Sequence, residues 1–419
     1  MSRTGSESML SPFRVLDLTD HKGLLCGKIL GDMGAEVIKV EPPGGDSARC
    51  IGPFYKEHPD PEKSLFWFAF NTNKKGITLD ITRADGCEIF KRLVADADFV
   101  LESFDPGYLK GLGLGYEELR LINRRIILVS ITGFGQSGPY RDFNVTDIIA
   151  MALGGHMYMT GDPDRPPVRC TFGQAYLNAS VEAAIGALVA HYHRELTGDG
   201  QHVDVSIQES VAGITLDQQV WWDLNRINVK RAGAFRIRPD NNVRHRFIWP
   251  CKDGYLVFVM IGGNWGAKSL GALTKWMDEE NMATDLLKTM DWEKFDWGKL
   301  LQDEVDAVMA PIGYFFMSHT KAELFEGAIK RRITLYPVSN ARDILDSVQL
   351  KARDFWIKME HPELNDSLIY PGAFVKATET PLTLRCRAPL IGEHNSQIYS
   401  SRLGLSDQDI RILKENRII

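Results

Sequence analysis

One short segment has the spacing of a ligand-binding loop. Gly133-Phe134-Gly135-Gln136-Ser137-Gly138 fits the pattern GxGxxG and follows an apolar run. In dinucleotide-binding proteins, such glycines let the backbone approach a pyrophosphate where a helix begins. Here residues 139–144 are typical of a loop. We therefore favour a glycine-rich substrate loop, with Gly133, Gly135 and Gln136 as candidate contacts, over a dinucleotide site or a plain surface turn.

Other familiar catalytic patterns are missing from the sequence. The ten histidines show no HExxH or similar spacing, the six cysteines form no CxxC pair, and there is no GxSxG. We therefore predict no metal site and no hydrolase serine. The Lys74-Lys75 pair is most simply a solvated turn, unless a phosphate-bearing ligand is implied by other residues. Unpaired cysteines favour reduced thiols and a cytoplasmic location.

Strand and helix patterns alternate along the first half of the chain. Short apolar runs predict buried strands, and residues spaced by three and four predict amphipathic helices. Such alternation is typical of the α/β class, with a mainly parallel sheet and right-handed crossovers. The expected strands are 36–40, 76–81, 99–101, 125–132 and 203–207, and the expected helices are 23–33, 85–96 and 116–122.

The second half of the sequence has a different pattern of residues. A long helix is expected at 176–196, and its small, apolar interior predicts packing on all sides, in the core or against a partner chain. Residues 228–245 are rich in arginine and lysine with little periodicity, which indicates a linker. A second compact region then follows, with an apolar run at 255–261, helices at 265–277 and 322–328, short strands after 337 and a closing helix at 406–415.

Composition narrows the functional classes further. The length of 419 residues is enough for two or three domains. A formal charge of −6 with no basic block argues against nucleic acid as a partner. No apolar run reaches the length of a membrane-spanning helix, and the first ten residues lack the pattern of a secretory signal.

An ordered series of segments changes the interpretation. Together they resemble the family III CoA-transferases, which include formyl-CoA and carnitine CoA-transferases and related acyl-CoA racemases. Each segment is weak by itself, but their order and spacing hold across nearly the whole chain. The segments are Val15-Leu16-Asp17-Leu18-Thr19, Gly34-Ala35-Glu36-Val37-Ile38-Lys39-Val40-Glu41-Pro42-Pro43-Gly44-Gly45-Asp46, Asn73-Lys74-Lys75-Gly76-Ile77-Thr78-Leu79-Asp80, Leu112-Gly113-Leu114-Gly115-Tyr116, Thr132 to Pro139, Thr197-Gly198-Asp199-Gly200-Gln201 and Ala388-Pro389-Leu390-Ile391-Gly392-Glu393-His394.

The resemblance implies a fold and a ligand. It implies a large Rossmann-like domain from residues 1–225 and 335–419, a linker and small domain at 226–334, and an interlocked dimer. The ligand would be a coenzyme A thioester as substrate, with no covalently bound cofactor. The expected CoA contacts in the large domain are Lys39, Asn73, Lys74, Lys75, Ser103 and Phe104.

The chemistry of this family depends on one aspartate. Its carboxylate attacks the acyl-CoA thioester to give a mixed anhydride, and the released CoA then forms an enzyme-bound thioester that the acceptor acid resolves. Counting back from Thr197 in the family's register places Tyr176 at that position, and no acidic residue lies between Asp164 and Glu182. A phenol with a pKa of about 10 is protonated at neutral pH and is a poor replacement nucleophile. Glu182 is six helical steps of about 100° away, which turns it off the same face.

Two further segments depart from the family pattern. Ser103-Phe104-Asp105-Pro106-Gly107 stands where Asn-Phe-Arg-Pro-Gly is more usual, and Thr19-Asp20-His21-Lys22-Gly23 replaces a more apolar loop. Some members of the family pair a catalytic subunit with a homologous subunit that lacks the aspartate, as in the succinyl-CoA:benzylsuccinate CoA-transferase of anaerobic aromatic degradation.

We therefore predict that this chain is the non-catalytic subunit of such a heteromer, with succinyl-CoA as donor and benzylsuccinate as acceptor. Its partner would be a homologous subunit that carries the catalytic aspartate. The alternative is an acyl-CoA transferase or isomerase that is active by itself and uses a different residue.

Overall fold

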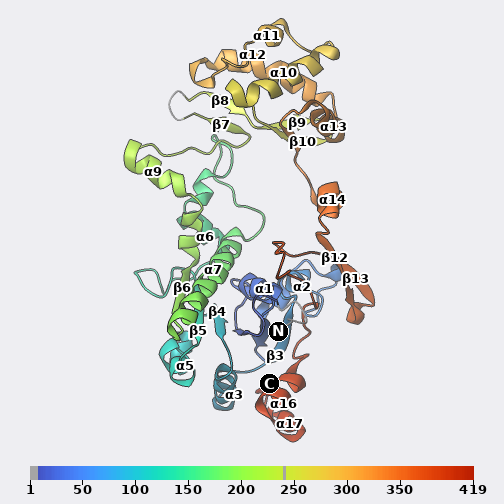
Figure 1. Cartoon of the computed structure of the whole chain (residues 1–419). Coiled ribbons are helices and arrows are strands. Elements are labelled where there is room, and N and C mark those ends of the chain that lie inside the picture. Colours follow the sequence, from blue (N-terminus) through green and yellow to red (C-terminus); the bar gives the residue numbers. More distant parts are fainter. Residues whose placement is uncertain (1–7, 239–241) are drawn as a thin grey trace. The chain divides into compact units, whose positions relative to one another are not determined.

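The computed structural model, which describes residues 8–238 and 242–419, contains a six-stranded parallel sheet (Figure 1). The strand order is β3-β2-β1-β4-β5-β6, and every neighbouring pair is parallel. Most of the strand residues are buried, as expected for a sheet with helices on both faces. The strands are β1 Arg14–Asp17, β2 Glu36–Glu41, β3 Lys74–Thr78, β4 Phe99–Glu102, β5 Ile127–Thr132 and β6 His202–Ser206.

This order is that of a doubly wound, Rossmann-like sheet, which confirms the predicted α/β class. Strand β1 pairs with β2 on one side and β4 on the other, so the winding reverses between β1 and β4. Ligands of open α/β sheets bind beyond the carboxyl ends of the strands at such a reversal. The predicted strands and helices of residues 23–207 are present, with boundaries shifted by a few residues.

The helices of this part of the chain surround the sheet. Helix α7 packs against α1, β5 and β6, while α3, α5, α16 and α17 contribute apolar side chains to a core on the sheet. The helices of this unit are α1 Leu24–Asp32, α2 Leu65–Phe70, α3 Ala84–Val94, α4 Tyr108–Gly111, α5 Tyr116–Ile122, α6 Asp147–Leu153, α7 Gln174–Thr197, α8 Ile207–Gly213, α15 Val348–Ala352, α16 Asn395–Leu403 and α17 Asp407–Glu415.

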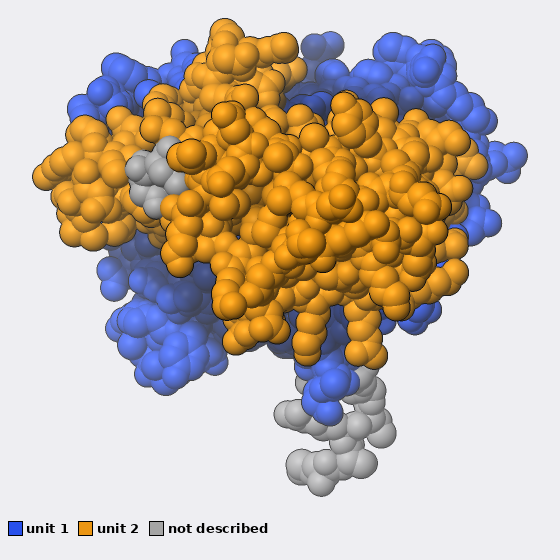
Figure 2. Space-filling view, turned by 90° about the horizontal axis from the view of Figure 1, so that it is seen from above, with its two compact units in different colours: residues 1–156, 170–214, 348–419 blue, residues 157–169, 215–347 orange. Residues whose placement is uncertain are grey.

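Both ends of the chain belong to the same compact unit. Unit 1 comprises the residues up to 156, 170–214 and 348–419, and unit 2 comprises 157–169 and 215–347 (Figure 2). The Tyr399 hydroxyl donates to the Thr78 carbonyl at 2.6 Å, which joins α16 to the end of β3. These contact-based boundaries differ from 225/226 and 334/335, and the predicted division into domains stays a prediction.

Unit 2 has its own aromatic core. A three-stranded antiparallel sheet packs with helices around Trp249, Phe258, Phe315 and Phe316. Its elements are β7 Phe235–Ile237, β8 Arg244–Arg246, β9 Ile248–Cys251, β10 Gly254–Phe258, β11 Leu335–Pro337, α9 Leu216–Asn225, α10 Gly263–Glu279, α11 Asp285–Thr289, α12 Gln302–Met317, α13 Lys321–Arg331 and α14 Ala341–Asp346. Strands β7 and β8 form an antiparallel pair over residues 235–246, so the segment expected to be a linker contains regular structure. These short strands are held by backbone hydrogen bonds between antiparallel neighbours. Such strands leave no long periodic pattern in the sequence by which they could be predicted.

Helix α7 is only partly packed in this chain. Its alanine-rich face is buried, but the opposite face carries Val181, Ile185, Val189, Tyr192 and Leu196, which are 42–69% exposed. Their spacing of four, four, three and four places them on one stripe of the helix. The single chain therefore does not bury this face, and packing of the face against a partner chain stays a prediction. Within the described residues, no helix is long and apolar enough to cross a membrane.

A buried cluster of charges joins the last residue of β1, the interior of β2 and the first residue of β3. The Asp17 carboxylate lies at the end of β1 and accepts a hydrogen bond from Lys74 Nζ at 2.8 Å, and both side chains are fully buried. Lys39 Nζ donates to the Thr19 carbonyl at 2.6 Å and pairs with Asp46 at 3.2 Å. Burial opposes ionisation of Asp17, but Lys74 and Lys39 outweigh it and lower the pKa of the carboxyl.

We predict that Asp17→Asn strongly destabilises the fold. It leaves the buried Lys74 ammonium without its counter-charge, and breaking one side of a buried ion pair costs roughly 3–5 kcal/mol. Chemical denaturation at neutral pH measures the free energy of unfolding. The exposed Asp142→Asn is the control and should change it by less than about 0.5 kcal/mol. Equal effects of the two substitutions would contradict the structural role of the cluster.

Candidate active site

Tyr176 lies in the first turn of the long helix α7. Gly173 precedes the helix, and the carboxylate of Asp147 accepts the Ala175 backbone N–H at 2.8 Å. A carboxylate at this place satisfies an unpaired amide and complements the positive end of the helix. Asp147 therefore holds the start of α7, and with it the position of Tyr176.

Tyr176 lines a largely apolar cavity of about 650 Å³ within unit 1. The walls come from α1, the segment 51–53, α2 and the start of α7, and include Leu25, Phe66, Phe70 and Phe172. None of the described residues that line the cavity carries a carboxylate. The arrangement can hold an apolar group, but it offers no ionised oxygen nucleophile.

The Tyr176 phenol is held in its protonated form. Burial is the main cause, and the nearby Asp147 and Asp20 add to it, so that the pKa rises to about 12. The ring meets His21 edge-on, with ring centroids 5.3 Å apart. At neutral pH the tyrosine is therefore neutral, a weak hydrogen-bond donor and not a nucleophile.

The loop that carries His21 is fixed by polar contacts. Asp20 Oδ1 accepts a hydrogen bond from the Ser103 hydroxyl at 2.8 Å, and the Ser103 oxygen accepts the Asp20 N–H at 2.9 Å. Lys22 Nζ pairs with Asp20 at 2.9 Å, and the Lys22 carbonyl accepts from the Ser180 hydroxyl of α7. This loop, which departs from the usual apolar sequence, thus connects the end of β4 to α7.

The predicted phosphate contacts divide into buried and accessible groups. Lys74 Nζ donates to Asp17, to the Leu24 carbonyl and to Asn71, which accounts for all three of its hydrogens. Lys39 is equally buried in the charge cluster described above. Neither ammonium is presented to a ligand, and these contacts favour a bracing role for both.

Asn73 and Lys75 also differ in burial, because the first side chain is buried and the second is accessible. The buried Asn73 amide donates to Asp32 at 2.8 Å and accepts the Arg385 N–H at 2.6 Å, which fastens the segment before α16 to β3. Lys75 keeps about a third of its side chain exposed and pairs with Glu36 at 2.8 Å. Of the predicted lysine contacts, Lys75 is therefore the most available to an anion.

Phe104 lines a second cavity, of about 360 Å³, at the carboxyl ends of β1 to β4. Its ring stacks on Tyr108 with centroids 4.7 Å apart. The other walls include the acidic side chains of Asp20, Glu41 and Asp80. A flat ring can bind beside Phe104, but the acidic lining opposes phosphate groups.

The glycine-rich loop is ordered by β6. Both Asp204 carboxylate oxygens accept the Gln136 N–H, at 2.9 and 3.1 Å. Gly135 has φ +84°, a conformation that favours glycine, and a Cβ on Gly133 would lie 2.7 Å from Val145. No helix begins between this loop and α6, which confirms the predicted loop character of 139–144. Gln136 lines a third cavity, apart from the cavity of Tyr176.

That third cavity contains residues that the sequence analysis missed. It has a volume of about 250 Å³ and includes Glu102 of β4, Ser130 of β5 and His202 of β6. The Ser130 hydroxyl lies 2.9 Å from His202 Nε2, and Glu102 accepts the Phe104 N–H at 2.8 Å. Burial is the main cause that raises the Glu102 pKa to about 7. The sequence signal that could have revealed Glu102 is an acidic residue at the end of a buried strand.

Among the described residues, no cluster of histidine, cysteine and acidic side chains could hold a metal ion.

Comparison with known proteins identifies what this chain is similar to. The model of CoA-transferase family III matches residues 10–395. Subunit BbsE of the succinyl-CoA:(R)-benzylsuccinate CoA-transferase of Thauera aromatica is 33% identical over 93% of both chains. The succinyl-CoA–D-citramalate CoA-transferase of Chloroflexus aurantiacus is 34% identical over 98% of both chains, and the beta subunit of its succinyl-CoA–L-malate CoA-transferase is 30% identical over the full length of both.

Solved structures show the same fold. A CaiB/BaiF family protein of Brucella suis is 27% identical with a TM-score of 0.81, and the alignment covers 94% of this chain and all of that one. A protein of Mycobacterium tuberculosis is 25% identical with a TM-score of 0.72, over 94% and 99% of the two chains.

We predict that Glu102→Gln stabilises the protein above pH 7. The native pKa of Glu102, about 7, exceeds its ordinary value of 4.5. Between these values the native state binds the proton more tightly than the unfolded state does, so the contribution of Glu102 to stability falls as the pH rises through that window. The amide should raise the free energy of unfolding at pH 8 by about 1–3 kcal/mol and change little at pH 4.5.

Denaturation curves at both pH values measure this difference. Glu117→Gln, at an exposed glutamate in the first turn of α5, is the matched control and should leave the pH dependence unchanged. A Glu102→Gln variant with the same pH dependence as the wild type would show that Glu102 is ionised normally.

Proposed function

Because this chain belongs to CoA-transferase family III, we propose that it is the non-catalytic subunit of a heteromeric enzyme. The enzyme would move CoA between succinyl-CoA and a carboxylic acid, with benzylsuccinate as the acceptor. Enzymes of this family use a CoA thioester as substrate. The partner would be a homologous subunit that supplies the aspartate.

One observation carries this proposal. The cavity at the start of α7 contains Tyr176, with a pKa of about 12, and no carboxylate among its described lining residues. Acyl exchange through an enzyme-bound anhydride needs an ionised carboxylate that can attack the thioester carbon and later leave. A protonated phenol meets neither requirement at neutral pH.

The comparisons support the heteromeric assembly. Two of the similar proteins are named as subunits, one of a benzylsuccinate and one of a malate CoA-transferase. Both names include succinyl-CoA, which is also in the name of the similar citramalate enzyme. We therefore take succinyl-CoA as the donor, and benzylsuccinate as the acceptor from the first of these relatives.

The exposed stripe of α7 supports a partner chain. Val181, Ile185, Val189, Tyr192 and Leu196 present a continuous apolar surface at 42–69% exposure. Contiguous apolar patches on a folded chain mark interaction sites. We propose that the homologous subunit covers this stripe in an interlocked dimer.

Among the predicted CoA contacts, we retain Lys75 and Phe104. We assign the buried residues with partners inside the protein to bracing the fold, namely Lys39, Asn73, Lys74 and Ser103. The exposed Asp105, next to Phe104, adds a negative charge near the expected phosphates. This favours weaker CoA binding than a subunit with arginine at that position would have.

The alternative, in which the chain is active by itself through a different residue, requires another carboxylate near the thioester. Asp147 is close enough to raise the Tyr176 pKa, but its Oδ1 already accepts the Ala175 N–H at the start of α7. That contact accounts for its position, so we treat Asp147 as a positioning residue.

We predict that the purified chain alone transfers no CoA from succinyl-CoA to benzylsuccinate. Transfer should appear when a homologous subunit with the aspartate is added, because only that subunit can form the anhydride. Tyr176→Phe in this chain should keep the rate of the complex within about twofold, since it removes only a neutral hydroxyl. Chromatographic separation of the CoA esters measures the rate.

Hydroxylamine treatment provides the decisive control. It should release an acyl group from the partner and none from this chain. Activity of the isolated chain, together with a hydroxylamine-sensitive acyl adduct on one of its own residues, would refute the proposed role.

We also predict that Ile185→Glu prevents assembly. It places a charge at the middle of the exposed α7 stripe, where an interface would have to bury it without a counter-charge. Native mass spectrometry of the mixed subunits should show free chains, and circular dichroism should show an unchanged fold. Leu121→Glu, on α5 and 90% exposed, is the control and should assemble normally. Normal assembly of Ile185→Glu would exclude this stripe as the interface.

A further inference from the structure

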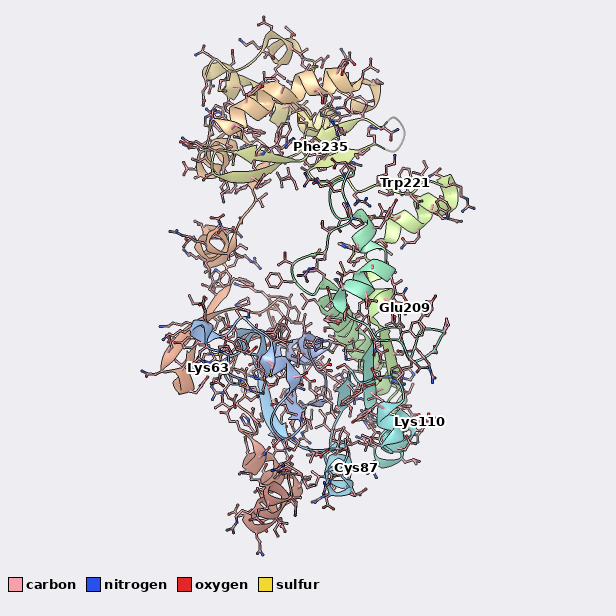
Figure 3. All side chains as sticks on the ribbon, turned by 180° about the vertical axis from the view of Figure 1, so that it is seen from behind. Lys63, Cys87, Lys110, Glu209, Trp221 and Phe235 are labelled. Atoms are coloured by element: carbon pink, nitrogen blue, oxygen red, sulfur yellow. The ribbon has the colours of Figure 1, made fainter. Side chains whose placement is uncertain are left out.

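Unit 2 contains a cavity of about 760 Å³ that the proposed catalytic role does not use. The β7–β8 hairpin forms one wall, the end of α9 another, and the segments 259–262 and 295–297 the rest. Figure 3 labels Trp221 of α9, which lines the cavity, and Phe235 of β7, which does not line it and marks the position of the hairpin. A volume of this size is typical of a site for a small molecule.

Strand alternation concentrates positive charge on the cavity side of the hairpin. Arg236 pairs with His245 in the register, and side chains directly opposite each other in an antiparallel pair share a face. Arg236, Arg238 and His245 accordingly line the cavity, while Arg244 and Arg246 pack on Phe235 on the other face. The hairpin thus separates its arginines into two sets.

The His245 ring is buried but incompletely bonded. It is 5% exposed, and its Nδ1 has no hydrogen-bond partner among the described residues. Burial, followed by the neighbouring Arg236 and Arg238, lowers its pKa to about 4, so the ring is neutral at pH 7. A buried polar atom without a partner is costly, and an acceptor in the cavity would remove that cost.

The cavity wall also presents the guanidinium of Arg236. Arg236 makes no ion pair with any residue in the described ranges, although it is long enough to reach a ligand. The acid in the lining is Asp296, whose Oδ1 accepts the Gly298 N–H at 2.9 Å and whose other oxygen lies 3.7 Å from Lys299. Asp296 therefore does not neutralise Arg236.

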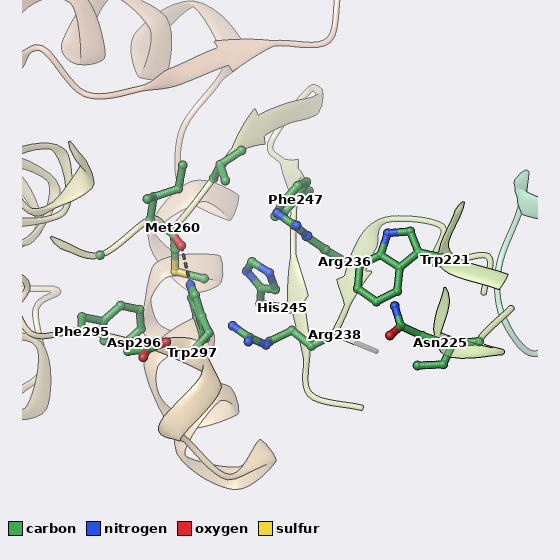
Figure 4. Close-up of a pocket in the computed structure, with 14 residues that line it drawn as sticks. Trp221, Asn225, Arg236, Arg238, His245, Phe247, Met260, Phe295, Asp296 and Trp297 are labelled. Carbon is green, nitrogen blue, oxygen red and sulfur yellow. Dashed lines mark hydrogen bonds between the residues drawn. The ribbon is translucent and has the colours of Figure 1, made fainter. Parts of the chain in front are cut away.

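Flat apolar surfaces flank these donors. Figure 4 shows His245 and Arg238 between Trp297 on one side and Trp221 on the other. The Trp297 ring lies 4.6 Å from His245 and 4.6 Å from Phe295, and its Nε1–H donates to the Met260 carbonyl. Trp297 is thus held rigidly and can form one side of a slot for an aromatic ring.

We propose that this cavity binds a carboxylic acid that carries an aromatic group. The carboxylate would accept hydrogen bonds from Arg236 and from His245 in the tautomer with its proton on Nδ1, while the ring would lie along Trp297. A planar guanidinium matches a planar carboxylate in two parallel hydrogen bonds. The inference deepens the proposed function, on which it rests for the choice of benzylsuccinate as the acid.

Isothermal titration of the full chain tests the ligand class. Benzylsuccinate should bind at least tenfold more tightly than succinate, which lacks the ring, and than 3-phenylpropan-1-ol, which lacks the carboxylate. CoA is the fourth compound titrated. Its phosphates and adenine also combine negative charge with a flat ring, so it could compete for the same cavity. Tighter binding of CoA than of benzylsuccinate at this cavity, or no saturable binding of benzylsuccinate, would overturn the proposal.

Paired substitutions test the site itself. Arg236→Met should weaken benzylsuccinate binding at least tenfold, whereas Arg244→Met, on the opposite face of the same hairpin, should change it less than twofold. His245→Phe should weaken binding severalfold without lowering the melting temperature, because it removes an unbonded nitrogen and keeps the ring. Equal losses for the two arginine variants, or a His245→Phe variant that keeps full affinity, would contradict the assignment.

The two proposals fail in distinguishable ways. CoA transfer by the two-subunit complex, combined with no binding of benzylsuccinate by this chain, would refute the cavity assignment alone. Binding that Arg236→Met abolishes, combined with the absence of transfer in every subunit mixture, would refute the catalytic assignment alone.

Discussion

The buried ion pair between Asp17 and Lys74 is the constraint on which the rest of unit 1 depends. It joins the last residue of β1 to the first residue of β3, and Lys39 extends it to β2 and to the loop that follows β1. Charges without contact to water are stable only when each is paired and hydrogen-bonded. The cluster therefore holds the loop with Asp20 and His21 in one conformation, and that loop forms the wall against which the Tyr176 ring packs.

The same cluster explains why lysines in a family pattern need not contact the ligand. In sequence, Lys39 and the Lys74-Lys75 pair look like candidates for phosphate binding, because a phosphate ligand is implied by the family. In the structure, Lys39 and Lys74 are buried and their hydrogens are directed to carboxylates and carbonyls of the protein, while Lys75 alone of the three is partly exposed. Burial and geometry, not residue type, separate the bracing lysines from the accessible one.

The two cavities with a proposed role differ in what they offer a ligand. The cavity of Tyr176 is largely apolar and presents a neutral hydroxyl, at the position where we propose that the nucleophile has been lost. The cavity of unit 2 combines two arginines and a neutral imidazole with tryptophan surfaces. The first is suited to structural support of a partner's reaction, and the second to recognition of an acid. Under the proposed function, a subunit without the nucleophile would in this way keep a role in substrate recognition.

The sequence by itself determined the α/β class, five of the six strands of the parallel sheet and the family, because these follow from local periodicity and from spacing along the chain. Strand β1 and the short helices α2, α4 and α6 gave too little periodic signal to be predicted. The partners of the charged residues, the raised pKa of Glu102 and the unpartnered face of α7 were decided only by the tertiary structure. So was the β7–β8 hairpin, whose short strands carry arginines and show too little apolar periodicity to be detected. Ionisation and exposure depend on which side chains the fold brings within a few ångströms of one another, and residues such as Arg236 and His245 become neighbours only when two strands pair.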